Sequence, residues 1–162
     1  MANQTGGGGT IILATFLVGF MLSQLPLPQV AEWFRPEWVV MIMIYWAMAL
    51  PERVGLGSAA VVGLGLDLIK GSPLGLNVIS LLIICYLALL LHKRLRMFPL
   101  VQQAMMVMIL VAINQMLLNW VHGLMGTRGD SLMFLVPAVM SALLWPWLFV
   151  ILRGLRRTFR VT

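Results

Sequence analysis

The sequence has few charged residues and no long polar segment. Only 10% of its 162 residues are charged, whereas 61% are hydrophobic. Soluble domains carry about 25% charged residues, and a chain of this length has room for one domain. A water-facing surface of that size cannot hide so many apolar side chains. The composition therefore excludes an ordinary soluble domain and predicts that lipid surrounds much of the chain.

The sequence also lacks the residue clusters from which common sites are built. The single cysteine, Cys85, lies in an apolar run and is expected to pack as a small hydrophobic side chain. The two histidines, His92 and His122, are expected on opposite sides of the membrane, so no metal site is predicted. No serine lies in a nucleophile motif. We therefore expect a protein that is not an enzyme and that holds no cofactor.

Six apolar stretches are predicted to be transmembrane helices. Crossing the ~30 Å hydrocarbon core takes about 20 helical residues, and the last three stretches reach or approach that length. The second and third are short, and a single re-entrant hairpin is the alternative. The polar turn Pro51-Glu52-Arg53 and the interfacial Trp33 and Trp38 favour two short spans.

The predicted fold is all-α, with six helices in one bundle that forms a single transmembrane domain over residues 1–162. The expected spans are residues 10–25, 38–50, 54–69, 74–91, 100–121 and 132–152, followed by a basic cytoplasmic tail over 153–162. The first stretch is not expected to be a signal peptide, because residues 1–10 contain no Lys or Arg and Pro26-Leu27-Pro28 replaces a cleavage site. Gly6–Gly9 is expected to be a flexible lead-in.

The positive charges are distributed unequally between the connections. Cytoplasmic connections of membrane proteins carry an excess of Lys and Arg, and eight of the eleven positive residues fall on the side of the N-terminus. Both termini are therefore predicted to be cytoplasmic. This clustering between apolar runs does not favour a nucleic-acid partner. The eight are Arg53, Lys93, Arg94, Arg96, Arg153, Arg156, Arg157 and Arg160, and the other three are Arg35, Lys70 and Arg128.

The basic tail over residues 153–160 is expected to anchor the topology and to contact anionic membrane lipids. Docking of a cytoplasmic partner on this tail is the alternative. The composition of the tail already accounts for the predicted orientation, which favours the first interpretation.

Polar groups inside the apolar stretches are costly in lipid and need partners or a function. Most of them are predicted to lie in the outer half of the membrane. Small residues and one acid, namely Gly55, Ala59, Gly63, Asp67 and Gly71, recur every four positions and share one helical face. Small residues at this spacing let a neighbouring helix approach closely, so we expect Asp67 to face protein.

A second polar face follows from the i, i+4, i+7 spacing of Gln115, Asn119 and His122. The two faces together predict a polar pocket open to the outer side. Asp67 is not expected to cap a helix, because the macrodipole disfavours an acid near a helix C-terminus. Its candidate partners are Lys70 and Arg35, and an ion pair with Lys70 that only ends the helix is the alternative. The predicted pocket or partner-binding residues are Arg35, Asp67, Lys70, Asn77, Gln115, Asn119 and His122, and the predicted packing residues are Gly55, Ala59 and Gly63.

Three groups of motifs occur in a characteristic order. They are Phe34-Arg35-Pro36-Glu37-Trp38 with Tyr45-Trp46 and Ala49-Leu50-Pro51, then Asp67-Leu68-Ile69 with Gly71-Ser72 and Leu74-Gly75, then Leu144-Trp145-Pro146-Trp147. With the chain length and the six-helix layout, they resemble the family of rod shape-determining protein MreD. The Arg-Pro element and the third-helix Asp of that family fall on Arg35, Pro36 and Asp67.

The resemblance implies a subunit of the bacterial inner membrane that supports lateral peptidoglycan synthesis during cell elongation. It implies MreC as direct partner, and MreB, RodA and a class B penicillin-binding transpeptidase within the assembly. It also implies a distant likeness to the substrate-binding subunits of energy-coupling-factor transporters. We therefore predict a non-enzymatic scaffold, with a small-molecule-binding or transport subunit that uses the polar pocket as the alternative.

Overall fold

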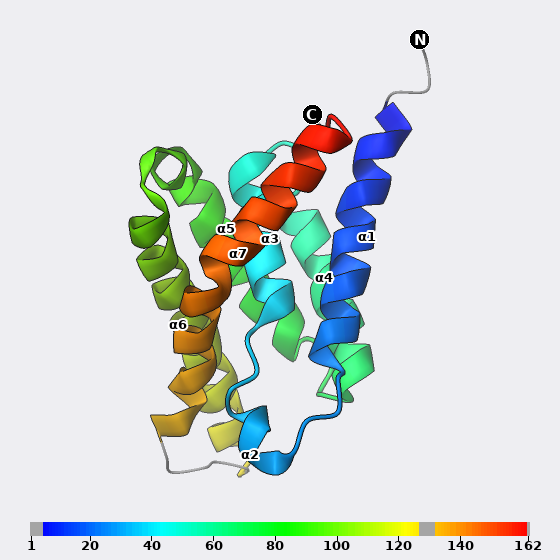
Figure 1. The fold of residues 1–162 in the computed structure, drawn as a ribbon. Helices are drawn as coiled ribbons and strands as arrows, with labels where there is room; N and C mark the ends of the chain where they lie inside the picture. Colours follow the sequence, from blue (N-terminus) through cyan, green and yellow to red (C-terminus); the bar gives the residue numbers. More distant parts are fainter. Residues whose placement is uncertain (1–4, 127–131, 162) are drawn as a thin grey trace.

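The computed structural model describes residues 5–126 and 132–161, and within these ranges it contains helices and no strand (Figure 1). The predicted all-α fold is therefore confirmed. The helices are α1 (Thr5–Ser23), α2 (Gln29–Glu32), α3 (Trp38–Ala49), α4 (Leu56–Lys70), α5 (Leu76–Met97), α6 (Leu100–Leu124), the 3-10 helix η1 (Leu132–Leu135) and α7 (Val136–Thr158). Arg128, one of the cations used to predict the orientation, lies outside the described residues.

Several helix ends differ from the prediction. The glycine lead-in is helical, and a side chain at Gly8 would meet Arg53 and Val161, so tertiary packing overrides the low helix propensity of glycine here. Helices α5 and α7 continue through the basic segments to Met97 and Thr158. Lys and Arg are good helix formers, and their charge is favourable in a last helical turn. The short α2 was not predicted.

Both chain ends lie at the same end of the bundle, which we call the terminal end (Figure 1). Helix α2 and the connection from α1 to α3 lie at the opposite end. By length and composition, three segments of the described chain are suited to cross a membrane: α5, α6 and Leu132–Thr158. Gly7–Ser23 and Trp38–Ala49 are shorter apolar helices.

Helix α3 forms the core of the bundle. Every residue from Val39 to Ala49 is at most 5% exposed, and α1, α5, α6 and α7 all contact this helix. An α-helix that is apolar all round is stable only when neighbours cover every side. Its few polar groups are paired, since the indole nitrogen of Trp46 donates to Thr15 Oγ1 at 2.9 Å. The sequence indicated that α3 is a short span, and the structure adds that other helices enclose it.

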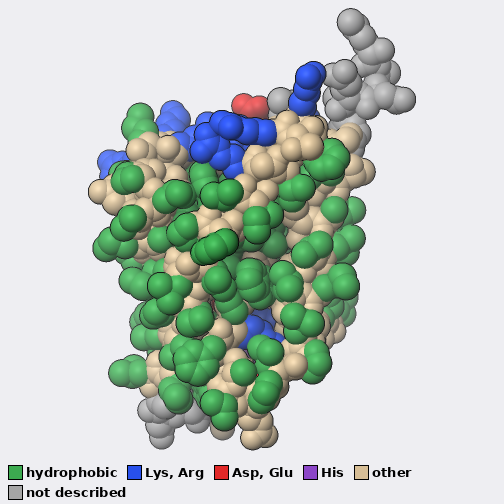
Figure 2. Space-filling model, in the orientation of Figure 1, with side chains coloured by type: hydrophobic (Ala, Val, Ile, Leu, Met, Phe, Trp, Pro, Cys, Tyr) green, Lys and Arg blue, Asp and Glu red, His purple; other side chains and the backbone are tan. Residues whose placement is uncertain are grey.

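The flanks of the bundle are covered by exposed apolar side chains, as Figure 2 shows for one face. Examples from four helices are Leu13, Val61, Leu90 and Trp147, all more than half exposed. Basic side chains gather at the terminal end instead. A broad apolar flank of this kind is what lipid covers in a membrane protein, in agreement with the composition.

Helices α4 and α5 approach each other closely at Gly63. A Cβ built on Gly63 would lie 2.6 Å from Val78 Cα and 2.9 Å from the carbonyl oxygen of Asn77. Ala59 and Asp67, on the same face, are also buried. The small-residue face is therefore filled by a helix of the same chain. Gly55 takes no part in this contact, because it precedes α4 and a Cβ there would meet open space.

Candidate functional site

Asp67, at the end of α4, is the centre of a polar cluster that joins α4 to the start of α5. It is 1% exposed, so the prediction that it faces protein is confirmed. Its Oδ1 accepts hydrogen bonds from Ser72 Oγ at 2.8 Å, from the Asn77 amide side chain at 2.8 Å and from the Asn77 backbone N–H at 3.0 Å. Its Oδ2 accepts from the Gly75 N–H at 2.9 Å.

This geometry makes Asp67 the cap of the following helix. The N-cap position of α5 is Gly75, which has no side chain to accept the unpaired N–H groups of the first turn. Asp67 supplies that acceptor from α4, and its negative charge lies at the favourable end of the α5 macrodipole. The turn between the helices needs left-handed backbone at Gly71 (φ 65°) and Gly75 (φ 101°). The expectation that Asp67 is no cap considered only its own helix and is wrong.

The predicted cationic partners of Asp67 are also wrong. Within the described ranges, no ion pair joins Asp67 to Lys70 or Arg35, and the donors to its carboxylate are uncharged. Arg35 instead donates to the carbonyl oxygens of Ser23 and Leu25, at 2.6 and 2.5 Å. Those carbonyls lie at the C-terminal end of α1 and just beyond it, where a cation is favourable.

The predicted pocket residues are only partly brought together. Lys70, Asn77 and His122 line one cavity of about 360 Å³ between the α4–α5 turn and α6. Asn119 lines a different cavity, beside η1. Gln115 lines neither and donates to Glu37 Oε1 at 2.7 Å. The structure therefore divides the predicted pocket into separate places.

Glu37 is a linking residue that the sequence reasoning missed. Besides accepting from Gln115 on α6, it donates its backbone N–H to Ser141 Oγ on α7 at 3.0 Å. It precedes α3 at the N-cap position. The available signal was an acid directly before an apolar helix, where negative charge is favourable.

Arg96 and Gln103, at the terminal end, were also missed as site residues. Arg96 donates to the carbonyl oxygens of Met48 and Ala49 at the end of α3, at 2.8 and 2.5 Å. The side chain of Gln103 donates to the Leu95 carbonyl at 2.7 Å. Arg96 pairs carbonyl groups that the end of α3 leaves without partners. Gln103 adds a second donor to the Leu95 carbonyl near the end of α5, which also accepts from the Phe98 N–H. Spacing along one helix cannot show such bonds between helices.

The described ranges contain no group of three or more His, Cys, Asp or Glu residues that is placed to hold a metal ion. The polar clusters join helix ends, and apolar side chains cover the flanks. These features define the class of the protein as a helical membrane protein.

Comparison with known proteins identifies the family. The family model of rod shape-determining protein MreD matches residues 5–155. The rod shape-determining protein MreD of Haemophilus influenzae is 32% identical over 150 residues, which cover 93% of each chain. The chain therefore belongs to the MreD family of rod shape-determining proteins. No solved structure matches it.

Proposed function

We propose that the protein is a non-enzymatic subunit of the bacterial inner membrane that binds MreC and supports lateral peptidoglycan synthesis. MreB, RodA and a class B penicillin-binding transpeptidase belong to the same proposed assembly. The observation that carries the proposal is the family match, which extends over nearly the whole chain.

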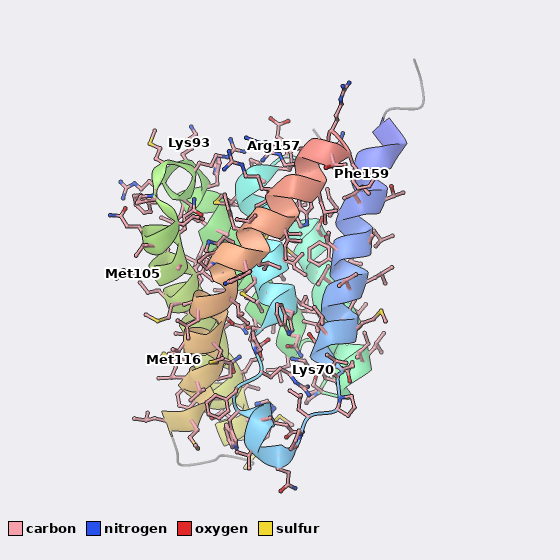
Figure 3. The ribbon with its side chains drawn as sticks, viewed as in Figure 1. Lys70, Lys93, Met105, Met116, Arg157 and Phe159 are labelled. Carbon is pink, nitrogen blue, oxygen red and sulfur yellow. The ribbon has the colours of Figure 1, made fainter. Side chains whose placement is uncertain are left out.

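The proposed topology is one transmembrane domain of six spans with both termini in the cytoplasm. Its support is that both chain ends lie at one end of the bundle, together with Lys93 and Arg157, whereas Lys70 lies toward the other end (Figure 3). This distribution agrees with the excess of positive charge on the cytoplasmic side.

The shortness of α3 does not oppose six spans. Its 12 residues extend about 18 Å, less than the hydrocarbon core. Non-helical backbone is tolerated at membrane depth where protein covers it. Val54, beyond the end of α3, is 2% exposed, which supports such a covered connection.

A groove between α1 and α4 is the surface that we propose for the transmembrane helix of MreC. The small-residue face of α4 is already filled by α5, so the partner needs another surface. The groove has a volume of about 480 Å³ and is lined by Gly9, Leu13, Phe16, Gly57 and Val61, among others. Both glycines have open space where a Cβ would lie. Small residues at a lipid-facing groove favour close packing of a second helix.

The alternative, a small-molecule-binding subunit, has weaker support. The cavity beside Lys70 and His122 is large enough for a small ligand. However, Asp67, Ser72 and Asn77 are bonded to one another, so this cluster has satisfied its polar groups without a ligand. Thermal stabilisation by a soluble metabolite would favour the alternative.

A pair of phenylalanine substitutions tests the proposed docking. Gly57→Phe places a ring in the groove, at a position where an added Cβ meets open space, and Ile109→Phe adds a ring at a half-exposed position on α6. In a rod-shaped host depleted of the native protein, we expect Gly57→Phe to lose MreC on co-purification and to leave cells round. Ile109→Phe should retain MreC and rod shape. Normal MreC recovery with Gly57→Phe would exclude this groove, and rod-shaped cells after depletion would contradict the function itself.

A further inference from the structure

A cavity at the terminal end, about 290 Å³ in volume, is lined by side chains from α3, α5, α6 and α7. We propose that it binds the phosphate group of an anionic membrane lipid. This site does not depend on MreC and lies at the opposite end of the bundle from the Asp67 cluster.

The cavity has a strongly positive lining. Arg153, Arg156 and Arg157 come from the last turns of α7, and Arg96 comes from the end of α5. The lining includes no Asp or Glu, and no ion pair to these arginines is found within the described ranges. Figure 2 shows the basic side chains gathered at this end, and Figure 3 shows Arg157 there on α7. Four arginines therefore line one space whose lining holds no acidic side chain.

The inner wall of the cavity is polar and already fixed in place. Tyr45 is 1% exposed and Gln103 is 4% exposed, although both line the cavity. Tyr45 shares this lining with Arg156. Arg96 is held by its bonds to the carbonyl oxygens that end α3. A ligand therefore meets donors that are in position before it binds, which lowers the entropic cost of binding.

The chemistry of this lining favours phosphate. Like charges that share a partly enclosed space repel one another more strongly than in water, and a bound anion relieves that repulsion. Each guanidinium has five N–H donors and no acceptor. Its planar fork matches two oxygens of a phosphate group. The phosphodiester of a lipid head group keeps two non-bridging oxygens, and each can accept more than one hydrogen bond, so several arginines can bind it at once.

The position of the cavity indicates a lipid as the source of the phosphate. Phe149 lines the cavity, and the neighbouring Val150 and Ile151 on α7 are about 60% exposed on the apolar flank. A head group held by the arginines would leave its acyl chains beside this flank. In the proposed topology, on which this step rests, the terminal end lies at the cytoplasmic leaflet, where anionic lipids are the abundant phosphate carriers. A soluble phosphate would make no use of the adjoining apolar surface.

The test compares two triple variants of the full-length protein that lose the same charge. Arg153→Gln, Arg156→Gln and Arg157→Gln together remove the α7 side of the cavity. Lys93→Gln, Arg94→Gln and Arg160→Gln remove three exposed cations that do not line it. Native mass spectrometry measures retained phosphatidylglycerol in competition with phosphatidylcholine. We expect the cavity variant to lose about tenfold in preference for phosphatidylglycerol, and the control variant to lose less than about threefold. Equal losses would overturn the site.

A charge-preserving variant and a soluble probe complete the test. Replacing the same three arginines of α7 with lysine keeps the charge but removes the forks, so we expect a loss of about threefold. Full retention by the lysine variant would overturn recognition by guanidinium forks. Inorganic phosphate is the soluble arm, measured by thermal unfolding in detergent. Stabilisation by inorganic phosphate without any preference for phosphatidylglycerol would overturn the assignment to a lipid.

Discussion

The two ends of the bundle use charged side chains in opposite ways. At the end that holds the α4–α5 turn, the acid Asp67 is buried and receives all its hydrogen bonds from uncharged groups of the same chain. At the terminal end, four arginines surround a cavity without a counter-charge. The Asp67 carboxylate therefore receives its hydrogen bonds from within the chain, whereas the arginines have further N–H donors that a ligand could use.

This difference separates residues that hold helices together from residues that are available to bind a ligand. Asp67 fills the acceptor position that Gly75 lacks, so its charge is used to hold α4 and α5 together. Arg96 also bonds a helix end, whereas Arg153, Arg156 and Arg157 of α7 line the cavity beside it. An intramembrane acid is thus a weaker indication of a binding site here than the basic end of α7.

The largest expected effect comes from Asp67→Leu, which removes the common acceptor of the α4–α5 turn. Two backbone N–H groups would lose their partner: that of Asn77, which is buried, and that of Gly75, which is partly buried. Leaving buried donors unpaired costs about 1–3 kcal/mol each, so we expect a loss of about 4 kcal/mol in the free energy of unfolding. Denaturation in mixed micelles measures it. If stability is unchanged, the carboxylate does not hold the two helices together.

A smaller effect is expected from Gly63→Ala, with Gly57→Ala as the control on the same helix. The new methyl group at residue 63 would lie 2.6 Å from the backbone of Val78, so α4 and α5 must separate. Overpacking of this kind costs about 1–3 kcal/mol. At residue 57 the methyl group meets open space, and alanine is the better helix former. The same unfolding assay should therefore separate the two variants, and equal stability would show that the helices do not touch at Gly63.

The fold class and most helix bounds could be predicted because they depend on local signals. The length of the apolar stretches and the four-residue spacing of Ala59, Gly63 and Asp67 predicted the helices and the buried face of α4. The continuation of α5 and α7 through the basic segments was not predicted, because the expected spans followed the apolar stretches alone. Charge near a C-terminus in fact stabilises the last turn.

The partners within the candidate site could not be predicted in the same way. A hydrogen bond from Gln115 to Glu37, or from Arg96 to the end of α3, joins residues that are far apart in the sequence. Periodicity shows which residues share a face of one helix, but it does not show which helix lies opposite. The resemblance marked Asp67, Gly71, Ser72 and Gly75 as a group, and the structure explains them together as a capped turn.

The smallest expected effect is that of Lys70→Gln, and it tests the contrast between the two ends directly. An ion pair between Lys70 and Asp67 was a natural expectation from their spacing, yet the carboxylate is bonded by Ser72, Gly75 and Asn77 instead. Lys70 is exposed, and exposed substitutions away from such contacts change stability by at most about 0.5 kcal/mol. We therefore expect unfolding of Lys70→Gln to match that of the unaltered protein, in low salt and in high salt alike. A loss of unfolding free energy near that of Asp67→Leu, which becomes smaller in high salt, would mean that Asp67 depends on the positive charge of Lys70. The acid would then need a counter-charge after all, because the neutral donors of the turn alone would not be enough to hold it.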